Sequence, residues 1–211
     1  MRNKPNYRRR RTVSVLVLLI AVVVVVALLS RGGGGPGSKE NPVPTLAFVS
    51  KINTVAQSKA PDAAAKQANG DAVVKMVTDF YQEAFVDPRK WGDGQFADLR
   101  ELFAKDAQPS FAKNVAALTI GLARTQLKRV DPTAATLTVT VYYDTKSKAT
   151  LAVAAASFNA RGTLKDSGPA VTIKQKATFY MQKQGDSWII TDFDAEQTQD
   201  TPTPTPSPSA S

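Results

Sequence analysis

The chain has 211 residues, enough for one domain with appendages, and it contains no Cys and no His. These absences exclude a disulfide framework, a thiolate nucleophile, Ser-His-Asp catalysis and metal sites built from Cys or His. Of the net charge of +9, residues 1–11 carry +6, residues 12–69 carry +3, residues 70–196 carry +1 and Asp200 carries −1. Because residues 70–196 are nearly neutral, they lack the basic surface typical of a nucleic-acid-binding domain, and we expect no nucleic-acid partner.

A membrane anchor is predicted near the N-terminus. Residues 12–30 contain the apolar run VSVLVLLIAVVVVVALL, which is near the minimum length for a transmembrane helix. Residues 1–11 form a short basic tail before it, so the positive-inside rule places this tail in the cytoplasm and the rest of the chain outside the membrane. A cleaved signal peptide is the alternative, but no A-x-A cleavage motif follows Leu29. We therefore expect a single-pass cell-membrane protein with an extracytoplasmic C-terminal domain.

Segments of low complexity flank the predicted domain. Residues 31–69 contain the Gly/Pro-rich stretch GGGGPGSKENPVPT at residues 32–45, which predicts a flexible linker. Within and just beyond this range, residues 46–70 could form a stalk helix or be disordered, and the sequence does not decide between them. Residues 197–211 are rich in Pro, Thr and Ser and are predicted to be a disordered tail, open to O-glycosylation. The folded domain is thus expected over residues 70–196.

Helices are predicted in the first half of this domain. An amphipathic helix is indicated by apolar residues at helical spacing, namely Val73, Val77, Phe80, Tyr81 and Ala84. We expect Asn69 or Asp71 to cap its start, and Asp87-Pro88 to end it. Two shorter helices are expected to follow, one over residues 96–103 and one beginning at Pro109.

Strands are predicted in the second half, where the apolar period changes to two. Alternation indicates strands over residues 137–143, 171–181 and 188–193, and composition suggests two more over residues 120–130 and 150–163. Turns are expected at Asp131-Pro132, Asp166–Pro169 and Gln184–Asp186. Helices followed by strands predict an α+β fold in which an antiparallel sheet carries helices on one face.

The chain also resembles a known superfamily. The segment WIITDF, residues 188–193, resembles the last strand of NTF2-like (cystatin-like) domains, and the helix containing Phe80-Tyr81 resembles their first helix. This resemblance implies a cone of three helices packed on a curved antiparallel sheet. The order of a basic tail, one membrane span and an exported domain is similar to the layout of accessory subunits of bacterial conjugation and type IV secretion systems. It is also similar to the layout of membrane proteins associated with mammalian-cell-entry transporters. It implies a non-catalytic assembly role, with the membrane and other envelope-complex proteins as partners.

Candidate catalytic and metal-binding residues are few. A ketosteroid-isomerase-like enzyme needs a carboxylate base and a tyrosine donor in an apolar pocket. The parts that could serve, in no recognisable catalytic spacing, are Asp79, Tyr81, Tyr142, Tyr180 and Asp192. Three carboxylates that alternate at the end of the last strand could hold Ca²⁺ or Mg²⁺, but a solvated strand end explains them more simply: Asp192, Asp194 and Glu196. We expect no cofactor and no metal.

Aromatic side chains are the candidate pocket or contact residues. They are Tyr81, Trp91, Phe103, Tyr142, Phe158, Tyr180 and Trp188. Each has a simpler interpretation as a core residue, including Trp91 as a cover for one end of the helical layer. The Thr/Lys face of the sheet is either plain solvated surface or the site of a partner or homo-oligomer. A filled interior would favour an assembly subunit, a deep apolar cavity a small-ligand binder, and a cavity with a raised-pKa Asp facing a Tyr an enzyme.

Overall fold

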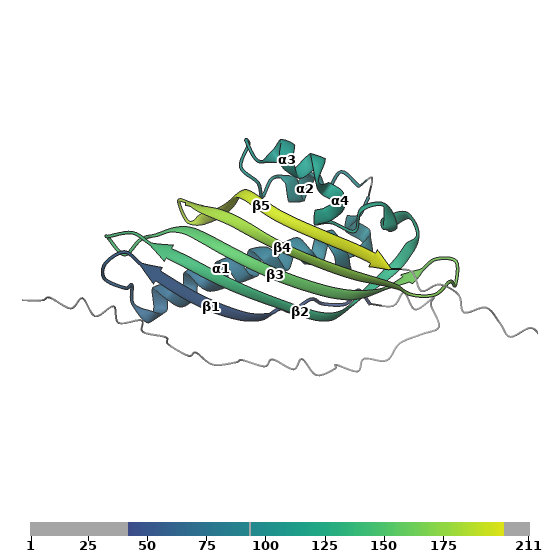
Figure 1. The fold of residues 1–211 in the computed structure, drawn as a ribbon, viewed down its shortest axis with the longest axis horizontal. Helices are drawn as coiled ribbons and strands as arrows, with labels where there is room; N and C mark the ends of the chain where they lie inside the picture. Colours follow the sequence, from purple (N-terminus) through teal and green to yellow (C-terminus); the bar gives the residue numbers. More distant parts are fainter. Residues whose placement is uncertain (1–41, 93, 201–211) are drawn as a thin grey trace, which may run out of the picture. The chain divides into compact units, whose positions relative to one another are not determined.

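The computed structural model describes residues 42–92 and 94–200. Its main element is a five-stranded sheet in the order β1-β2-β3-β4-β5, with the long helix α1 lying against one face (Figure 1). The strands are β1 Val49–Ala56, β2 Leu127–Tyr143, β3 Ala149–Leu164, β4 Val171–Gln184 and β5 Ser187–Asp200. The helices are α1 Ala63–Tyr81, the π-helical η1 Gln82–Val86, the 3-10 helix η2 Pro88–Lys90, α2 Ala97–Arg100, α3 Gln108–Lys113, α4 Val115–Leu118 and the 3-10 helix η3 Gly121–Thr125.

The helix α1 contains the predicted apolar face but begins earlier than the sequence suggested. Its N-cap is Asp62, whose Oδ1 accepts a hydrogen bond from the backbone N–H of Ala65 at 2.7 Å, as capping acids typically do. Asn69 and Asp71, the predicted caps, lie inside the helix instead. The helical segment continues through η1 and ends at Asp87, because Pro88 disfavours helical geometry in the residue before it.

Alternation along β2, β3 and β4 gives the sheet a buried inner face and an exposed outer face. The inner face packs against α1: the side chain of Ile52 on β1 reaches Gly70, and the hydroxyl of Tyr143 on β2 donates to the carbonyl of Ala65 at 3.4 Å. The predicted turns between β3 and β4 and between β4 and β5 are present, and Gly185 supplies a positive φ in the second.

The predicted fold class, an NTF2-like cone of three helices on an antiparallel sheet, is wrong for the described residues. The sheet is mixed, because β1 pairs with β2 in parallel while the other neighbours are antiparallel. A parallel pair needs a long crossover connection, and every helix of the described residues lies in the connection that joins β1 to β2. Beyond α1, the helices described here have only three to six residues, so a three-helix layer is not formed.

Three local predictions also differ from the structure. Segment 46–70 is neither a stalk helix nor disordered, since it contains β1 and the start of α1. Asp131-Pro132 is not a turn but part of β2, where the pairing with β3 shifts register between Pro132 and Ala134, and such bulges are where a strand accepts proline. Residues 120–130 hold η3 and the first part of β2 in place of a separate strand.

The predicted basic tail, the predicted transmembrane helix and residues 201–211 of the predicted Pro/Thr/Ser tail lie outside the described residues. The first part of that tail, residues 197–200, was predicted to be disordered but belongs to β5. Within residues 42–92 and 94–200, no helix combines the length and apolar character needed to cross a bilayer.

Aromatic rings fill the centre of the layer between α1 and the inner face. The ring of Tyr81 stacks on Phe85 with centroids 5.4 Å apart, and it packs against Phe158 at 5.5 Å. Phe80 contacts Phe179 at 5.3 Å and Phe103 at 6.2 Å. Edge-to-face and offset arrangements at these distances stabilise a core beyond the burial of apolar area alone.

Candidate functional site

The outer face of the sheet is the surface with the clearest functional features. We define it by the side chains that point away from α1, which register pairing places in rows across the strands. From β1 to β5 its four rows are Val49, Thr136, Ser157, Lys176 and Glu196; Lys51, Thr138, Ala155, Thr178 and Asp194; Asn53, Thr140, Val153, Tyr180 and Asp192; and Val55, Tyr142, Leu151, Gln182 and Ile189.

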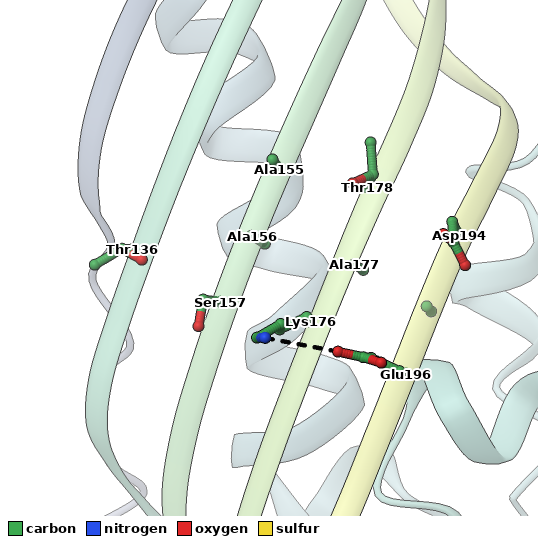
Figure 2. Close-up of a pocket in the computed structure, with 10 residues that line it drawn as sticks. Thr136, Ala155, Ala156, Ser157, Lys176, Ala177, Thr178, Asp194 and Glu196 are labelled. Atoms are coloured by element: carbon green, nitrogen blue, oxygen red, sulfur yellow. Dashed lines mark ion pairs between the residues drawn. The ribbon is translucent and has the colours of Figure 1, made fainter.

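A shallow hollow of about 300 Å³ lies on this face over β3, β4 and β5, with Thr136 of β2 at its border. Figure 2 shows Ala155 as a short stub at one side of it, with Thr178, Asp194, Lys176 and Glu196 around it. Lys176 Nζ and Glu196 Oε1 are 3.7 Å apart and both side chains are largely exposed, so this ion pair contributes little to stability. The hollow exists because alanine on β3 is shorter than the threonines and charged side chains of the neighbouring strands.

Exposed apolar side chains also gather on the outer face. Its members include every large hydrophobic side chain found exposed among the described residues: Val49 at 68%, Leu151 at 49%, Val55 at 47% and Tyr180 at 44%. Val55 and Leu151 share one row with the half-buried Tyr142 between them, and Tyr180 lies in the next row. Apolar groups gathered on one face in this way are typical of a contact surface.

The seven predicted aromatic residues fall into two groups. Five are buried in the core and therefore serve packing: Tyr81, Trp91, Phe103, Phe158 and Trp188. The other two, Tyr142 and Tyr180, lie on the outer face and are accessible to a partner. Where an aromatic residue lies outside a regularly alternating strand, the sequence did not show whether its ring is buried or accessible. Ala155, which lines the hollow, belongs to no recognisable motif.

The residues considered for an isomerase-like site are not brought together as such a site. The hydroxyl of Tyr81 donates to Oε1 of the buried Gln175, a neutral amide. Burial raises the pKa of Tyr81 well above its usual range, although the hydrogen bond to Gln175 opposes this. Asp79 lies on the exposed side of α1 and pairs with Lys75 at 2.5 Å. Tyr180 and Asp192 are paired neighbours on β4 and β5, but both side chains face open solvent rather than an apolar pocket.

Carboxylates on the last strand lie in a line rather than around a point. Asp192, Asp194 and Glu196 alternate along the outer face of β5, and Glu196 is the member that pairs with Lys176. In the part of the chain that the structure describes, no three acidic side chains converge in a way that could hold a metal ion. A hard cation such as Ca²⁺ needs six to eight converging oxygens, so this line of carboxylates carries no argument for one.

Neither a protein-family model nor a curated protein matches the chain. Its function is therefore inferred from the geometry of the outer face and from the segments that precede the sheet domain.

Proposed function

We propose that the chain is a membrane-anchored, non-catalytic accessory subunit that binds other proteins of a bacterial cell-envelope complex through the outer face. One observation carries this proposal: the exposed large hydrophobic side chains of the described residues all lie on the outer face, and three of them, Val55, Leu151 and Tyr180, occupy two adjacent rows beside the polar hollow. An apolar centre with polar and charged residues beside it is the usual composition of a protein–protein contact surface.

The packing of the inner face favours a protein-binding surface rather than an internal ligand site. Candidate pocket liners such as Phe158, Phe103 and Trp188 are buried against other side chains between the sheet and the helices. Their area is used to stabilise the fold. The surface open to a partner is then the outer face.

The amino-terminal segment supports attachment to the membrane. The apolar run within residues 12–30 follows six basic side chains and no acidic one, which favours a cytoplasmic N-terminus and an extracytoplasmic sheet domain. A reporter that works only in the cytoplasm, fused after Ser211, should be silent, while one that works only outside should be active. A strongly active cytoplasmic reporter contradicts this topology.

Retention of the anchor is tested separately. The full chain should stay in the membrane fraction after a carbonate wash, and its mature form should begin at or near Met1, because no cleavage motif follows Leu29. A mature start near Gly32 would instead show a secreted protein.

The binding surface is tested by photocrosslinking in cells that produce the full chain in its native envelope. A photoreactive phenylalanine analogue at Tyr180 or Leu151 should give discrete protein adducts. The matched control is the same analogue at Lys75, which is also highly exposed but lies on α1. Equal adducts at all three positions, or none at the outer face, would refute the proposed surface. An adduct of lipid or other small mass would instead favour a small-ligand binder.

A further inference from the structure

The edge strand β1 offers a second surface, distinct from the outer face. It lies at one end of the strand order and pairs only with β2 among the described strands (Figure 1). It runs for eight residues without proline and pairs with β2 without a register shift. An uninterrupted edge of this kind presents unpaired N–H and C=O groups, which can form a ladder with another strand.

The backbone shows which residues face this open edge. The N–H of Gln57, directly after β1, donates to the carbonyl of Tyr143 on β2 at 3.1 Å. Because hydrogen-bonding direction alternates along a strand, the odd-numbered residues of β1 face β2. Ser50, Ile52, Thr54 and Ala56 therefore direct their backbone groups to the open side. The odd-numbered side chains stand on the outer face, where Val49 and Val55 are exposed.

We propose that β1 pairs antiparallel with β1 of a second copy of this chain, centred on Ile52 and forming one continuous ten-stranded sheet. The register is self-complementary: Ile52 faces its own equivalent, and Val49 faces Val55 of the second copy at both ends. Placing apolar β-branched residues opposite each other stabilises a strand pair, and here it covers two of the side chains that the isolated copy exposes.

Lys51 selects this register among the symmetric ones. Lysine on an edge strand normally discourages pairing, and centring the pair on Lys51 would place two like charges directly opposite. In the proposed register Lys51 faces Asn53 of the second copy, and the two lysines are only diagonal neighbours. A centre at Asn53 also avoids the facing lysines, but it places each exposed Val55 opposite Lys51 and leaves Val49 without a partner. The register centred on Ile52 is the one that matches both valines.

Disulfide cross-linking can test this pairing without interference, because the chain contains no cysteine and each introduced thiol is the only one in its copy. Two differently tagged full-length copies, one with Val49→Cys and one with Val55→Cys, are produced together in cells and oxidised. Residues 49 and 55 would form a non-hydrogen-bonded pair with Cα atoms about 4.5 Å apart, within the range for a disulfide. Each variant alone should not cross-link, because six residues of strand separate the like positions by about 20 Å.

Three outcomes would overturn the proposal. Absence of the mixed disulfide, while maleimide labels both thiols, would show that the edges do not pair. A Lys51→Cys variant that cross-links to itself more readily would show a different register. Equal cross-linking of an exposed Leu151→Cys control, which lies on β3 away from the edge, would show random collision or face-to-face contact.

A charge change at the same edge gives an independent readout. Asn53→Lys places a second lysine opposite Lys51 of the other copy, at two symmetric sites. The yield of the mixed disulfide should fall about fivefold, equivalent to about 1 kcal/mol over the two cross-strand pairs. Asn53→Glu should raise the yield instead. An unchanged yield in both variants would contradict the proposed register, since neither substitution alters the inner face.

Discussion

The buried pair between Tyr81 on α1 and Gln175 on β4 should show strong energetic coupling. Tyr81→Phe removes the donor and leaves Oε1 of Gln175 in the core without it, while Gln175→Met leaves the Tyr81 hydroxyl without its acceptor. An orphaned buried polar group costs about 1–3 kcal/mol, whereas replacing both partners by apolar groups is nearly neutral. Each single variant should therefore lose about 1–3 kcal/mol. Gln175→Met also removes the Nε2 donor to the carbonyl of Ala117 at 3.4 Å, a cost that the double variant keeps, so the double variant should lose clearly less than the sum of the two single losses.

Urea unfolding of fragment 42–200, monitored by tryptophan fluorescence, measures all four corners of this cycle. Losses that add in the double variant would refute the reasoning, since they would show that the two groups act independently. A second readout uses pH. Because burial raises the pKa of Tyr81 in the folded state, its contribution is present at neutral pH and is lost as the pH rises past its ordinary value near 10. Tyr81→Phe should lack this part of the alkaline destabilisation.

Three further predictions concern the helix ends, the edge and the last strand. Asp87→Asn should cost about 1 kcal/mol at pH 7. A hydrogen bond from the Arg89 side chain holds the pKa of Asp87 below its usual range, so this cost should begin to shrink as the pH falls below about 4 and disappear as the pH passes the lowered pKa; a cost that stays undiminished on acidification would contradict this. Gly70→Ala should destabilise the domain, since a Cβ there would lie 2.6 Å from Cγ2 of Ile52. In an Ile52→Ala background, where this clash is absent, the same substitution should stabilise the domain by up to about 1 kcal/mol. Stabilisation in the wild-type background as well would show that the clash with Ile52 does not determine the effect. Trp188→Ala should cost about 3–5 kcal/mol. Replacing the exposed carboxylates Asp192, Asp194 and Glu196 by their amides should change stability by less than about 0.5 kcal/mol. Thermal melts of both variants measure these two effects, and melts with and without Ca²⁺ test whether the three carboxylates bind it.

The elements that the sequence predicted well are those with one fully buried side. The apolar face of α1 and the alternation of β2 and β4 follow directly from burial, because exposure changes with a fixed period along each of them. The strand β3 was predicted from its Ala/Val-rich composition. The strand β1 was not predicted because its periodicity is reversed in part. Its inner face carries Ser50 and Thr54, while Val49 and Val55 stand on the outer face. Because the residues of this edge strand are exposed or only half-buried, hydropathy alone does not reveal it.

The candidate site was predicted only where the alternation was clear. The Thr/Lys pattern of β2 and β4 indicated an exposed sheet face, and Tyr142 and Tyr180 lie on it. Buried rings such as Tyr81 and Phe158 could not be told from pocket liners, because an aromatic side chain has the same sequence signature whether it meets another ring or a ligand. The hollow is lined by small side chains such as Ala155 and Ser157, and a small side chain leaves no chemical motif.

The two proposed surfaces have a geometric consequence when they are combined. In the register centred on Ile52, outer-face residues pair with outer-face residues, so the two-fold axis stands perpendicular to the sheet. The outer faces of both copies, with their hollows and the exposed side chains of Leu151 and Tyr180, then lie on the same side of one sheet. A partner with two equivalent sites could engage both copies at once, and the second contact would form at a high effective concentration. Weak contacts at each hollow would then be sufficient for a stable assembly, and the Asn53→Lys variant should weaken partner capture even though it leaves the hollow unchanged.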